Sequence, residues 1–275
     1  MDDSAGNNES SPLSVGVVTV ATNRYIDYWH EMALSADRHL FPGHEVVLHV
    51  FTDRPADVRA MAGDFSNIVV NPVTVDSLGW PEATLLRYEV FDAHSKDLEQ
   101  DLLIHLDADM LVAQDVGPEL QPTTWPKGIA LVRHPGYRRP SMSRRVSLYI
   151  SDPRLALGDT YALAKIGAIG SWETDDRSRA FVPRRSRGTY VCGGTWFGLR
   201  TAFLPMVREL AVRTRADLDE GVVAMWHDES HLNWFASGHR TAVLGSEYCF
   251  APGFANLRDL TPKIIAVDKA DERTR

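Results

Sequence analysis

The stretch SVGVVTVATNRYIDYWHEMALSADRHLFPGHEVVLHVFT, residues 14–52, decides the fold class. Its first part, 14–22, is a Val-rich run of the kind that forms a strand buried on both faces of a parallel sheet. Apolar side chains from Ile26 to Leu40 then recur at helical spacing, Pro42-Gly43 ends that pattern, and 45–52 is again strand-like. A strand, a helix and a strand form a βαβ unit, which predicts an α/β protein with a mainly parallel central sheet flanked by helices.

The rest of the sequence continues this alternation. Further strands are expected at 68–75, 101–106, 128–133, 190–199 and 241–244, and helices at 83–98, 203–218 and 228–236. Between 141 and 170 the pattern is irregular, which is typical of a loop or small excursion over a binding site. No Pro/Gly/Ser-rich linker divides the chain, so we expect a disordered segment at 1–14 and a single domain at 15–275.

The composition is that of an ordinary globular protein. Of 275 residues, 44% are hydrophobic and 24% charged, which is enough for a sizeable core and excludes disorder as the default. The formal net charge of −8 provides no positive field for nucleic acid or an anionic membrane. Residues 177–187 are locally rich in arginine, but Asp175 and Asp176 adjoin them, so we interpret this stretch as a solvated loop. No nucleic-acid partner is expected.

The cysteine content and the N-terminal residues indicate in which cellular compartment the protein is expected. Only Cys192 and Cys249 are present, too few for a disulfide framework, and both stand in apolar surroundings. Residues 1–14 are polar and acidic, and no run of about eighteen apolar residues occurs. We therefore expect no signal peptide, no membrane span and a cytoplasmic location, with the protein a monomer or a homodimer.

Asp107 and Asp109 come directly after the apolar run LLIHL, residues 102–106. In open α/β sheets, ligands bind at the carboxyl ends of the strands, where these side chains are expected. Two aspartates separated by Ala108 can direct carboxylate oxygens to one hard divalent cation, while a diphosphate supplies further oxygens. The tripeptide alone is a weak signal, and its alternative is a solvated strand end. The buried strand before it favours the metal site.

The hexapeptide WHDESH, residues 226–231, is the densest polar cluster in the chain. Asp228 or Ser230 can cap the helix that follows, but capping does not account for two carboxylates and two imidazoles. His227 and His231 are four residues apart, so zinc must be considered, although the pattern is not H-E-x-x-H and no third ligand suggests itself. Alternatively, the carboxylate of Glu229 can stabilise or attack an oxocarbenium-like anomeric carbon.

Two glycine-containing segments remain ambiguous on spacing. Gly193-Gly194 lies inside the strand-like run 190–199, where it indicates either a bulge or the close approach of a ligand or another backbone. His134-Pro135-Gly136 ends another expected strand, and a lone histidine there is more often a hydrogen-bonded structural residue than a ligand.

Taken together, these segments resemble glycosyltransferase family 6, the family of the blood-group A and B transferases and α1,3-galactosyltransferase. The resemblance rests on HLFPGHEVVLHVFTD (39–53), LLIHLDADM (102–110), RHPGY (133–137), AFVP (180–183), CGGTWFG (192–198) and, above all, AMWHDESHLNWF (224–235). It implies a GT-A fold and a Mn²⁺-dependent, retaining transfer from a UDP-sugar to a 3-hydroxyl group of a glycan acceptor, with Mg²⁺ as a substitute ion.

The resemblance also implies roles for individual residues. Asp107 and Asp109 match the family's metal-binding D-x-D, and Glu229 matches the carboxylate beneath the anomeric centre. The remaining residues implied at the UDP-sugar are Val20, Ala21, Thr22, Tyr25, Arg87, Ala108, Cys192, Gly193, Gly194, Asp228, Lys269 and Arg273. Those implied at the acceptor are His134, Gly136, Ser171, Trp226 and His227, together with Glu229.

Within the single domain, the resemblance implies a nucleotide-sugar lobe at 15–133, an acceptor and catalytic lobe at 134–262 and a flexible tail at 263–275. Lys269 and Arg273 lie in that tail, which is expected to fold over the diphosphate and exclude water. Gly136 and Gly194 match two positions that discriminate between donor sugars. Small residues there leave space for an acetamido group and favour UDP-GalNAc over UDP-Gal.

The sequence departs from the family pattern near the acceptor. Ala251 stands where an acidic residue is expected, and the stretch 141–170 is longer than in the family. For this reason the fucosylated blood-group acceptor is not transferred to this chain. Two alternatives stay open, namely transfer to a non-carbohydrate or secondary-metabolite hydroxyl, and a carbohydrate-binding descendant without catalysis.

Overall fold

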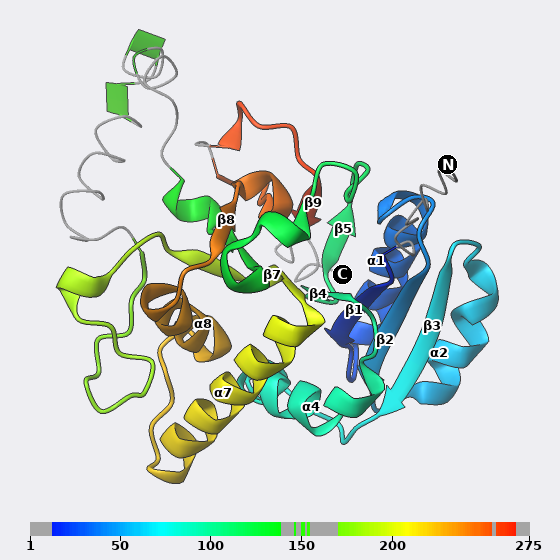
Figure 1. Ribbon diagram of the computed structural model, residues 1–275, viewed down its shortest axis with the longest axis horizontal. Coiled ribbons are helices and arrows are strands. Elements are labelled where there is room, and N and C mark those ends of the chain that lie inside the picture. Colours follow the sequence, from blue (N-terminus) through cyan, green and yellow to red (C-terminus); the bar gives the residue numbers. More distant parts are fainter. Residues whose placement is uncertain are drawn as a thin grey trace, which may run out of the picture.

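The structure is a computed structural model that describes residues 13–138, 146, 150–151, 153–154, 170–254 and 257–267 (Figure 1). The strands are β1 (Val15–Val20), β2 (Val46–Thr52), β3 (Ile68–Thr74), β4 (Leu102–Leu106), β5 (Met110–Val112), β6 (Ile129–Arg133), β7 (Val191–Leu199), β8 (Ala242–Leu244) and β9 (Ile264–Ala266). The helices are α1 (Tyr25–His39), α2 (Pro55–Met61), α3 (Glu82–Leu85), α4 (Arg87–Ala93), α7 (Arg200–Asp219) and α8 (His227–Gly238).

A seven-stranded sheet forms the centre of the molecule, in the order β3-β2-β1-β4-β7-β6-β8. Only β7 runs antiparallel to its neighbours, β4 and β6. The predicted α/β class with a mixed, mainly parallel sheet is therefore confirmed, and the arrangement agrees with a GT-A, Rossmann-like fold. Because β1 and β4 are adjacent and parallel, the segments that follow them meet at one edge of the sheet.

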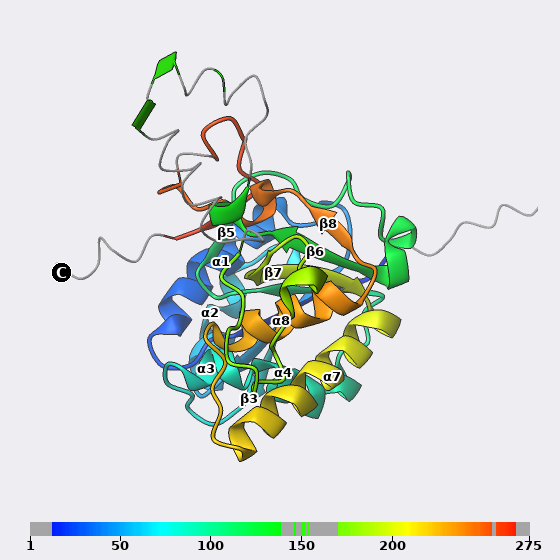
Figure 2. The same ribbon diagram turned by 90° about the vertical axis from the view of Figure 1, so that its left-hand side faces the viewer.

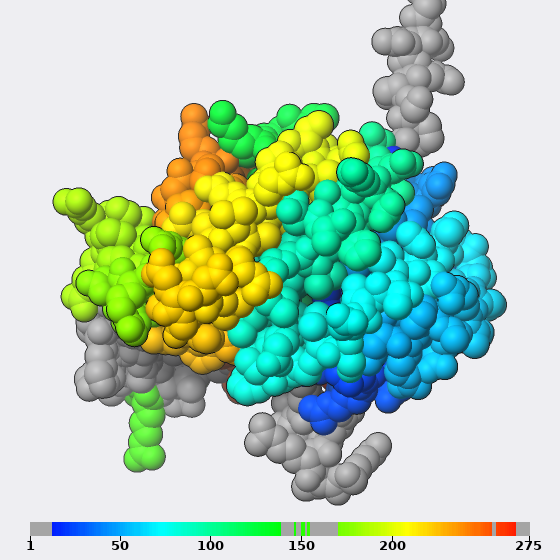
Figure 3. All heavy atoms as spheres, turned by 90° about the horizontal axis from the view of Figure 1, so that it is seen from below, coloured from blue at the N-terminus to red at the C-terminus, as the bar shows by residue number. Residues whose placement is uncertain are grey.

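Helices cover both faces of this sheet (Figure 2). Alternate side chains of one strand serve opposite faces: Val17 packs into a core that includes Trp29 of α1, and Val18 into one that includes Phe91 of α4 and Phe203 of α7. Figure 3 shows α7, in yellow, lying beside the teal residues of α4 on the second of these faces. The alternation explains why the buried strands appear in the sequence as continuous apolar runs.

A second sheet contains only β5 and β9, which pair antiparallel. β5 follows the D-x-D motif directly, and the Val267 N–H donates to the Asp109 carbonyl at 3.0 Å. The segment predicted as a flexible tail, 263–275, thus begins with a paired strand beside the D-x-D. Strands of three residues give too little period-two pattern to be seen in a sequence.

The expected helix at 83–98 is interrupted, which corrects the prediction. Helix α3 ends before Leu86, whose φ and ψ of −98° and 2° are not helical, and α4 begins at Arg87. A short 3₁₀ turn at 95–97 completes the stretch. The sequence also gave no indication of α2, which starts at Pro55, a residue suited to the first turn of a helix. None of the helices within the described residues is long and apolar enough to cross a membrane.

Candidate active site

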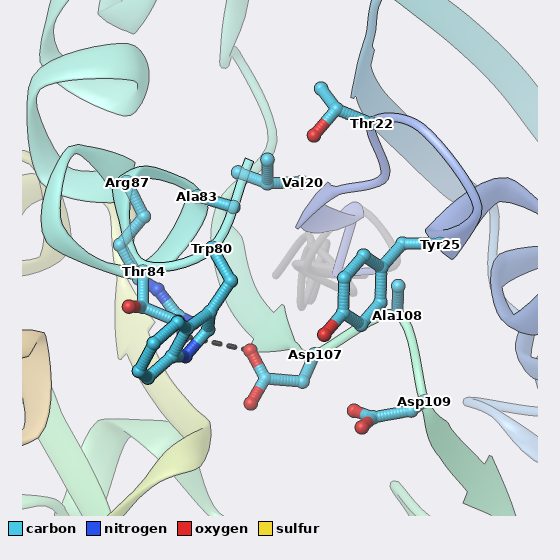
Figure 4. A pocket seen from close by; sticks show the side chains of 10 residues that line it. All are labelled: Val20, Thr22, Tyr25, Trp80, Ala83, Thr84, Arg87, Asp107, Ala108 and Asp109. Carbon is cyan, nitrogen blue, oxygen red and sulfur yellow. Dashed lines mark ion pairs between the residues drawn. The ribbon is translucent and has the colours of Figure 1, made fainter. Parts of the chain in front are cut away.

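The segments after β1 and β4 line a pocket of about 160 Å³ at the edge of the sheet (Figure 4). The Tyr25 ring and the Trp80 indole reach it from opposite sides, and the Asp107 carboxylate lies between them. Its lining residues are Val20, Thr22, Tyr25, Trp80, Ala83, Thr84, Arg87, Asp107, Ala108 and Asp109. Of the residues just after β1 that the resemblance implies at the UDP-sugar, Thr22 and Tyr25 line the pocket, whereas Ala21 is buried away from it and extends β1 through a hydrogen bond from its N–H to the Phe51 carbonyl at 2.9 Å.

Arg87 connects the D-x-D motif with the WHDESH cluster. Its buried guanidinium places Nη1 2.8 Å from Asp107 Oδ1 and Nε 3.4 Å from Asp228 Oδ2. Burial opposes the charge, but the two carboxylates outweigh it and raise the pKa of Arg87. The side chain is thus a fixed cation that joins acidic groups from two distant parts of the sequence.

His105 of β4 is a third side chain that contacts Arg87, besides Asp107 and Asp228. Its Nδ1 lies 3.1 Å from the Val18 carbonyl oxygen, and its Nε2 lies 2.6 Å from Arg87 Nη1. Burial, and next the charge of Arg87, lower the pKa of His105. The imidazole is therefore neutral in this environment.

The first turn of α8 presents Asp228 and Glu229. Burial raises the pKa of Asp228 to about 6, with Arg87 acting in the opposite direction. Burial also raises the pKa of the half-buried Glu229 to about 7, although its Oε2 accepts a hydrogen bond from the Gly193 N–H at 2.8 Å. A raised carboxyl pKa beside a pocket is a common property of catalytic acids and bases.

Gly193 and Gly194 leave the space that these carboxylates occupy. A Cβ atom at Gly193 would lie 3.1 Å from Asp228 Oδ2 and 3.2 Å from the Glu229 Cβ. A Cβ atom at Gly194 would lie 3.0 Å from Asp107 Oδ2. The structure shows both features that the sequence left open: the β6–β7 register is irregular opposite 192–195, and a carboxylate side chain approaches the backbone of β7 closely at each glycine.

The residues implied at the acceptor form a neighbouring aromatic cluster. The His134 ring lies 4.8 Å from that of Tyr137 and 5.6 Å from that of Tyr190, and burial lowers its pKa to about 4. Its Nδ1 accepts the Gly136 N–H at 3.0 Å. Ser171 joins the cluster because its Oγ hydrogen-bonds with the Tyr137 hydroxyl and its carbonyl accepts that of Tyr190.

Trp226 and His227 lie at the start of α8. Half of the Trp226 side chain is exposed, and the His227 ring packs against Trp80 with the centroids 5.6 Å apart. His227 Nδ1 is 3.1 Å from the Thr84 hydroxyl, whereas the buried His231 has Nε2 3.6 Å from Asp217. The two rings therefore face different partners, and within the described residues no group of three or more His, Cys, Asp or Glu side chains is arranged to hold a metal ion. The zinc interpretation has no support.

The donor set at the D-x-D fits a hard cation only in part. Asp107 and Asp109 place carboxylate oxygens at the pocket, the type of ligand that Mn²⁺ and Mg²⁺ prefer, but one oxygen of Asp107 is engaged by Arg87. Two carboxylates are too few to complete a coordination shell. The geometry therefore fits an ion whose other ligands come from a diphosphate and water.

Several site residues were missed, and several predicted ones cannot be placed. Trp80, Thr84, His105 and Tyr190 all lie at the site, and none of them was singled out from the sequence. Cys192 is buried, with its Sγ 3.9 Å from the Thr195 carbonyl. Lys269, Arg273 and most of 141–170 lie outside the described residues.

A comparison with known families identifies the group to which this geometry belongs. The sequence profile named Glycosyltransferase family 6 matches residues 7–133 and 163–275, which include the pocket, the D-x-D and the WHDESH cluster. The chain belongs to glycosyltransferase family 6. Hexosyl transfer from a nucleotide sugar is the activity associated with this family, so the protein is a glycosyltransferase.

Three characterised proteins show what this chain is similar to. The rat histo-blood group ABO system transferase 1 is 27% identical over 269 residues, which cover 95% of this chain and 68% of the rat protein. The human globoside alpha-1,3-N-acetylgalactosaminyltransferase 1 is 28% identical over 86% of this chain and 60% of its own length. The Escherichia coli O-antigen biosynthesis glycosyltransferase WbnI is 22% identical over 94% of this chain and 97% of its own.

Proposed function

We propose that this protein transfers GalNAc or Gal from a UDP-sugar to a hydroxyl group of a glycan acceptor, with retention of configuration and with Mn²⁺ as the cofactor. The observation that carries the proposal is the Arg87 bridge. It brings Asp107 of the D-x-D and Asp228 of α8 to one guanidinium, next to Glu229. The groups that hold a diphosphate and a carboxylate suited to an anomeric carbon are therefore adjacent. The α1,3 linkage is an expectation from the relatives.

The pocket supplies the binding steps of this proposal. Tyr25 provides a ring on which uracil can stack, and Trp80 closes the opposite wall. Asp107 and Asp109 hold the cation, which when bound supplies Lewis-acid stabilisation of the leaving diphosphate. Arg87 keeps Asp107 in place and adds a fixed positive charge near the developing negative charge.

Glu229 carries the chemical role. The Gly193 N–H fixes its orientation, and the half-buried setting excludes much of the water that would compete with the acceptor. As a carboxylate it stabilises positive charge on the anomeric carbon or attacks it, and both routes retain the configuration. The partly exposed rings of His134 and Tyr137 offer a surface for the face of an acceptor, with the buried Tyr190 ring packed against them.

Turnover of defined donors tests the proposal. UDP release is measured from UDP-GalNAc, UDP-Gal, UDP-Glc and UDP-GlcNAc, with Mn²⁺, Mg²⁺ or EDTA, and with glycan and non-carbohydrate alcohols as acceptors. We expect Mn²⁺-dependent release from a galacto-configured donor, UDP-GalNAc before UDP-Gal, and an axial product linkage by NMR. Equal turnover in EDTA would contradict the Mn²⁺ requirement, and a product with inverted anomeric configuration would contradict the retaining mechanism.

Two substitutions separate binding from chemistry. Asp109→Asn should weaken Mn²⁺ binding and turnover together, whereas Glu229→Gln should bind UDP nearly as the unmodified protein does and transfer orders of magnitude more slowly. Full activity of Glu229→Gln contradicts the assigned role. Transfer only to non-sugar alcohols supports the secondary-metabolite alternative, and tight UDP binding without turnover of any donor supports a carbohydrate-binding descendant. The cytoplasmic location and the monomeric or dimeric state stay predictions.

A further inference from the structure

His105 is buried in the middle of the sheet and is not part of the D-x-D motif. It stands on β4 in register with Val18 of β1 on one side and Trp196 of β7 on the other. Its ring packs against Trp196 and Phe91, with centroids 5.0 and 5.6 Å away. These walls are apolar, so the two ring nitrogens depend on the few polar atoms within reach.

The polar partners of His105 fix its tautomer. The Val18 carbonyl oxygen can only accept, so Nδ1 must carry the proton and donate to it at 3.1 Å. Nε2 then has a lone pair and accepts from Arg87 Nη1, which cannot act as an acceptor, at 2.6 Å. Asp107 Oδ1 is also 3.2 Å from Nε2, but two acceptors gain nothing from each other, and Arg87 Nη1 donates to both.

The contact matters because Arg87 must hold two carboxylates at once. Nη1 lies 2.8 Å from Asp107 and 3.4 Å from the Gly193 carbonyl, and Nε faces Asp228. A planar guanidinium meets these partners in only one orientation. His105 is the neutral acceptor in the sheet interior that selects this orientation, and it carries no charge that would compete with Asp107 for Arg87.

We propose that His105 of β4, held in its Nδ1–H tautomer by the Val18 carbonyl of β1, is a positioning residue that fixes the Arg87 guanidinium and thereby orients Asp107 for the cation and the donor diphosphate. The inference rests on the proposed function for its effect on the metal and UDP. Its structural part, the hydrogen-bond chain Val18–His105–Arg87–Asp107, is independent of it.

A matched pair of substitutions separates the effects of the two hydrogen bonds that His105 makes, because each variant removes only one of them. In His105→Asn the amide NH₂ replaces Nδ1–H and keeps the bond to Val18, but no atom in the place of Nε2 accepts from Arg87, which keeps only Asp107 and the Gly193 carbonyl as acceptors for Nη1. In His105→Gln the amide oxygen reaches the place of Nε2 and accepts from Arg87, but the bond to Val18 is lost. A role that is merely structural predicts that both substitutions act mainly on stability. A positioning role predicts that the Gln variant rescues function.

His49 supplies the control. It is another buried histidine, paired with Val18 from the opposite side on β2, but its Nε2 lies 2.8 Å from Gln100 and its Nδ1 3.1 Å from the Asn71 amide. It therefore carries its proton on Nε2 and has no contact with Arg87. His49→Asn should lower the melting temperature and leave UDP and Mn²⁺ binding unchanged.

The measurements are Mn²⁺ binding by EPR, UDP binding by calorimetry with Mn²⁺ and with EDTA, kcat and KM for the donor, thermal unfolding, and histidine ¹⁵N shifts of the whole protein. We expect the Nδ1–H tautomer at His105 and about tenfold or greater loss of Mn²⁺ affinity and kcat/KM in His105→Asn, as is typical when a partner of a metal ligand is removed. His105→Gln should stay close to the unmodified protein.

Three results overturn the inference: an Nε2–H tautomer at His105, unchanged Mn²⁺ and UDP binding in His105→Asn, or equal losses in the Asn and Gln variants at equal stability. Absence of Mn²⁺ binding in the unmodified protein is a failure of the proposed function instead. In that case the ¹⁵N shifts and the UDP affinity in EDTA still decide whether His105 positions Arg87.

Discussion

The carboxyl group of Glu229 is half-buried at the start of α8, where it accepts the Gly193 N–H at 2.8 Å. Burial is the main cause that raises its pKa from 4.5 to about 7, and this hydrogen bond opposes the shift. The proposed chemistry needs the carboxylate form. Near neutral pH we therefore expect the free enzyme to hold part of Glu229 in the protonated form, which does not serve the proposed chemistry.

The pH dependence of transfer follows from this pKa. We expect kcat/KM for the donor to rise with pH and to level off above about 7, because deprotonation of Glu229 in the free enzyme sets that limb. The check is a pH–rate profile at saturating Mn²⁺. A kcat/KM that is flat between pH 5 and about 8 assigns the essential carboxylate to another residue.

The same pKa has an effect on stability, measured without ligands. A carboxyl whose pKa is higher in the folded than in the unfolded state destabilises the fold once ionised, and this loss develops between the two pKa values, 4.5 and about 7. Glu229→Gln should therefore raise the melting temperature more at pH 8 than at pH 5, with pH values chosen around that window.

Glu119 is a control because its pKa is shifted in the opposite direction to that of Glu229. Burial disfavours its charge, but hydrogen bonds from Lys263 and Tyr248 lower its pKa below 4.5. Its ionised form thus stabilises the fold above its unfolded pKa, and that contribution is lost as pH falls. Glu119→Gln should lower the melting temperature at neutral pH. Shifts of the same sign in both variants would mean that ionisation is not their cause.

At the scale of elements, two adjacent glycines of β7 lie against different carboxylate side chains. A Cβ at Gly194 would press on Asp107, and one at Gly193 would press on Asp228 and Glu229. We expect Gly194→Ala mainly to weaken Mn²⁺ binding, and Gly193→Ala mainly to lower kcat with Mn²⁺ affinity nearly intact. Both effects are measured by Mn²⁺ titration followed by donor kinetics.

Gly188 provides the matched control for these glycines. It precedes β7, and an added Cβ meets no atom within 4 Å. Gly188→Ala should leave both Mn²⁺ affinity and kcat unchanged. If Gly193→Ala and Gly194→Ala lose the same property in the same proportion, the two glycines do not act on separate carboxylates.

The long elements were predictable because their periodicity reports burial. β1, α1, β2, β4, β7 and α7 lie within a few residues of their expected places. The break between α3 and α4 was not predictable from local sequence. It lies at Leu86, just before Arg87, and the partners of Arg87, Asp107 and Asp228, are distant in the sequence. Likewise, nothing local indicated that β5 pairs with β9, since that pairing is entirely non-local.

At the scale of the whole molecule, the resemblance indicated more of the site than the residues alone did. The resemblance implied Asp107, Asp228 and Arg87 separately, and the structure added that Arg87 joins the two carboxylates, with His105 beside it. Trp80 and Tyr190 were missed because an aromatic residue in a loop or strand looks the same whether it packs in a core or lines a site. The two lobes stay a proposal, since one sheet runs through both predicted ranges.

The predicted tail is tested by shortening the chain after Val267. This change keeps β9 and the Val267–Asp109 hydrogen bond but removes Lys269 and Arg273. We expect a higher KM for the UDP-sugar and a lower kcat at an unchanged melting temperature, because the diphosphate loses two cations while the fold keeps its strand. Unchanged donor kinetics would show that the tail has no part in closing the site.

The pairing of β5 with β9 has a consequence for protein synthesis. Met110–Val112 emerges from the ribosome long before Ile264–Ala266, since Ile264 is the 152nd residue after Val112 (264 − 112). At translation rates of about 5–20 residues per second, the strand beside the D-x-D waits roughly 8–30 seconds for its partner. All strands of the large sheet are therefore synthesised before β9, and we expect the D-x-D segment to reach its final arrangement only when β9 pairs with β5. A chain that stops before β9 lacks the partner of β5, the buried Ile264 side chain and the Val267–Asp109 hydrogen bond beside the D-x-D.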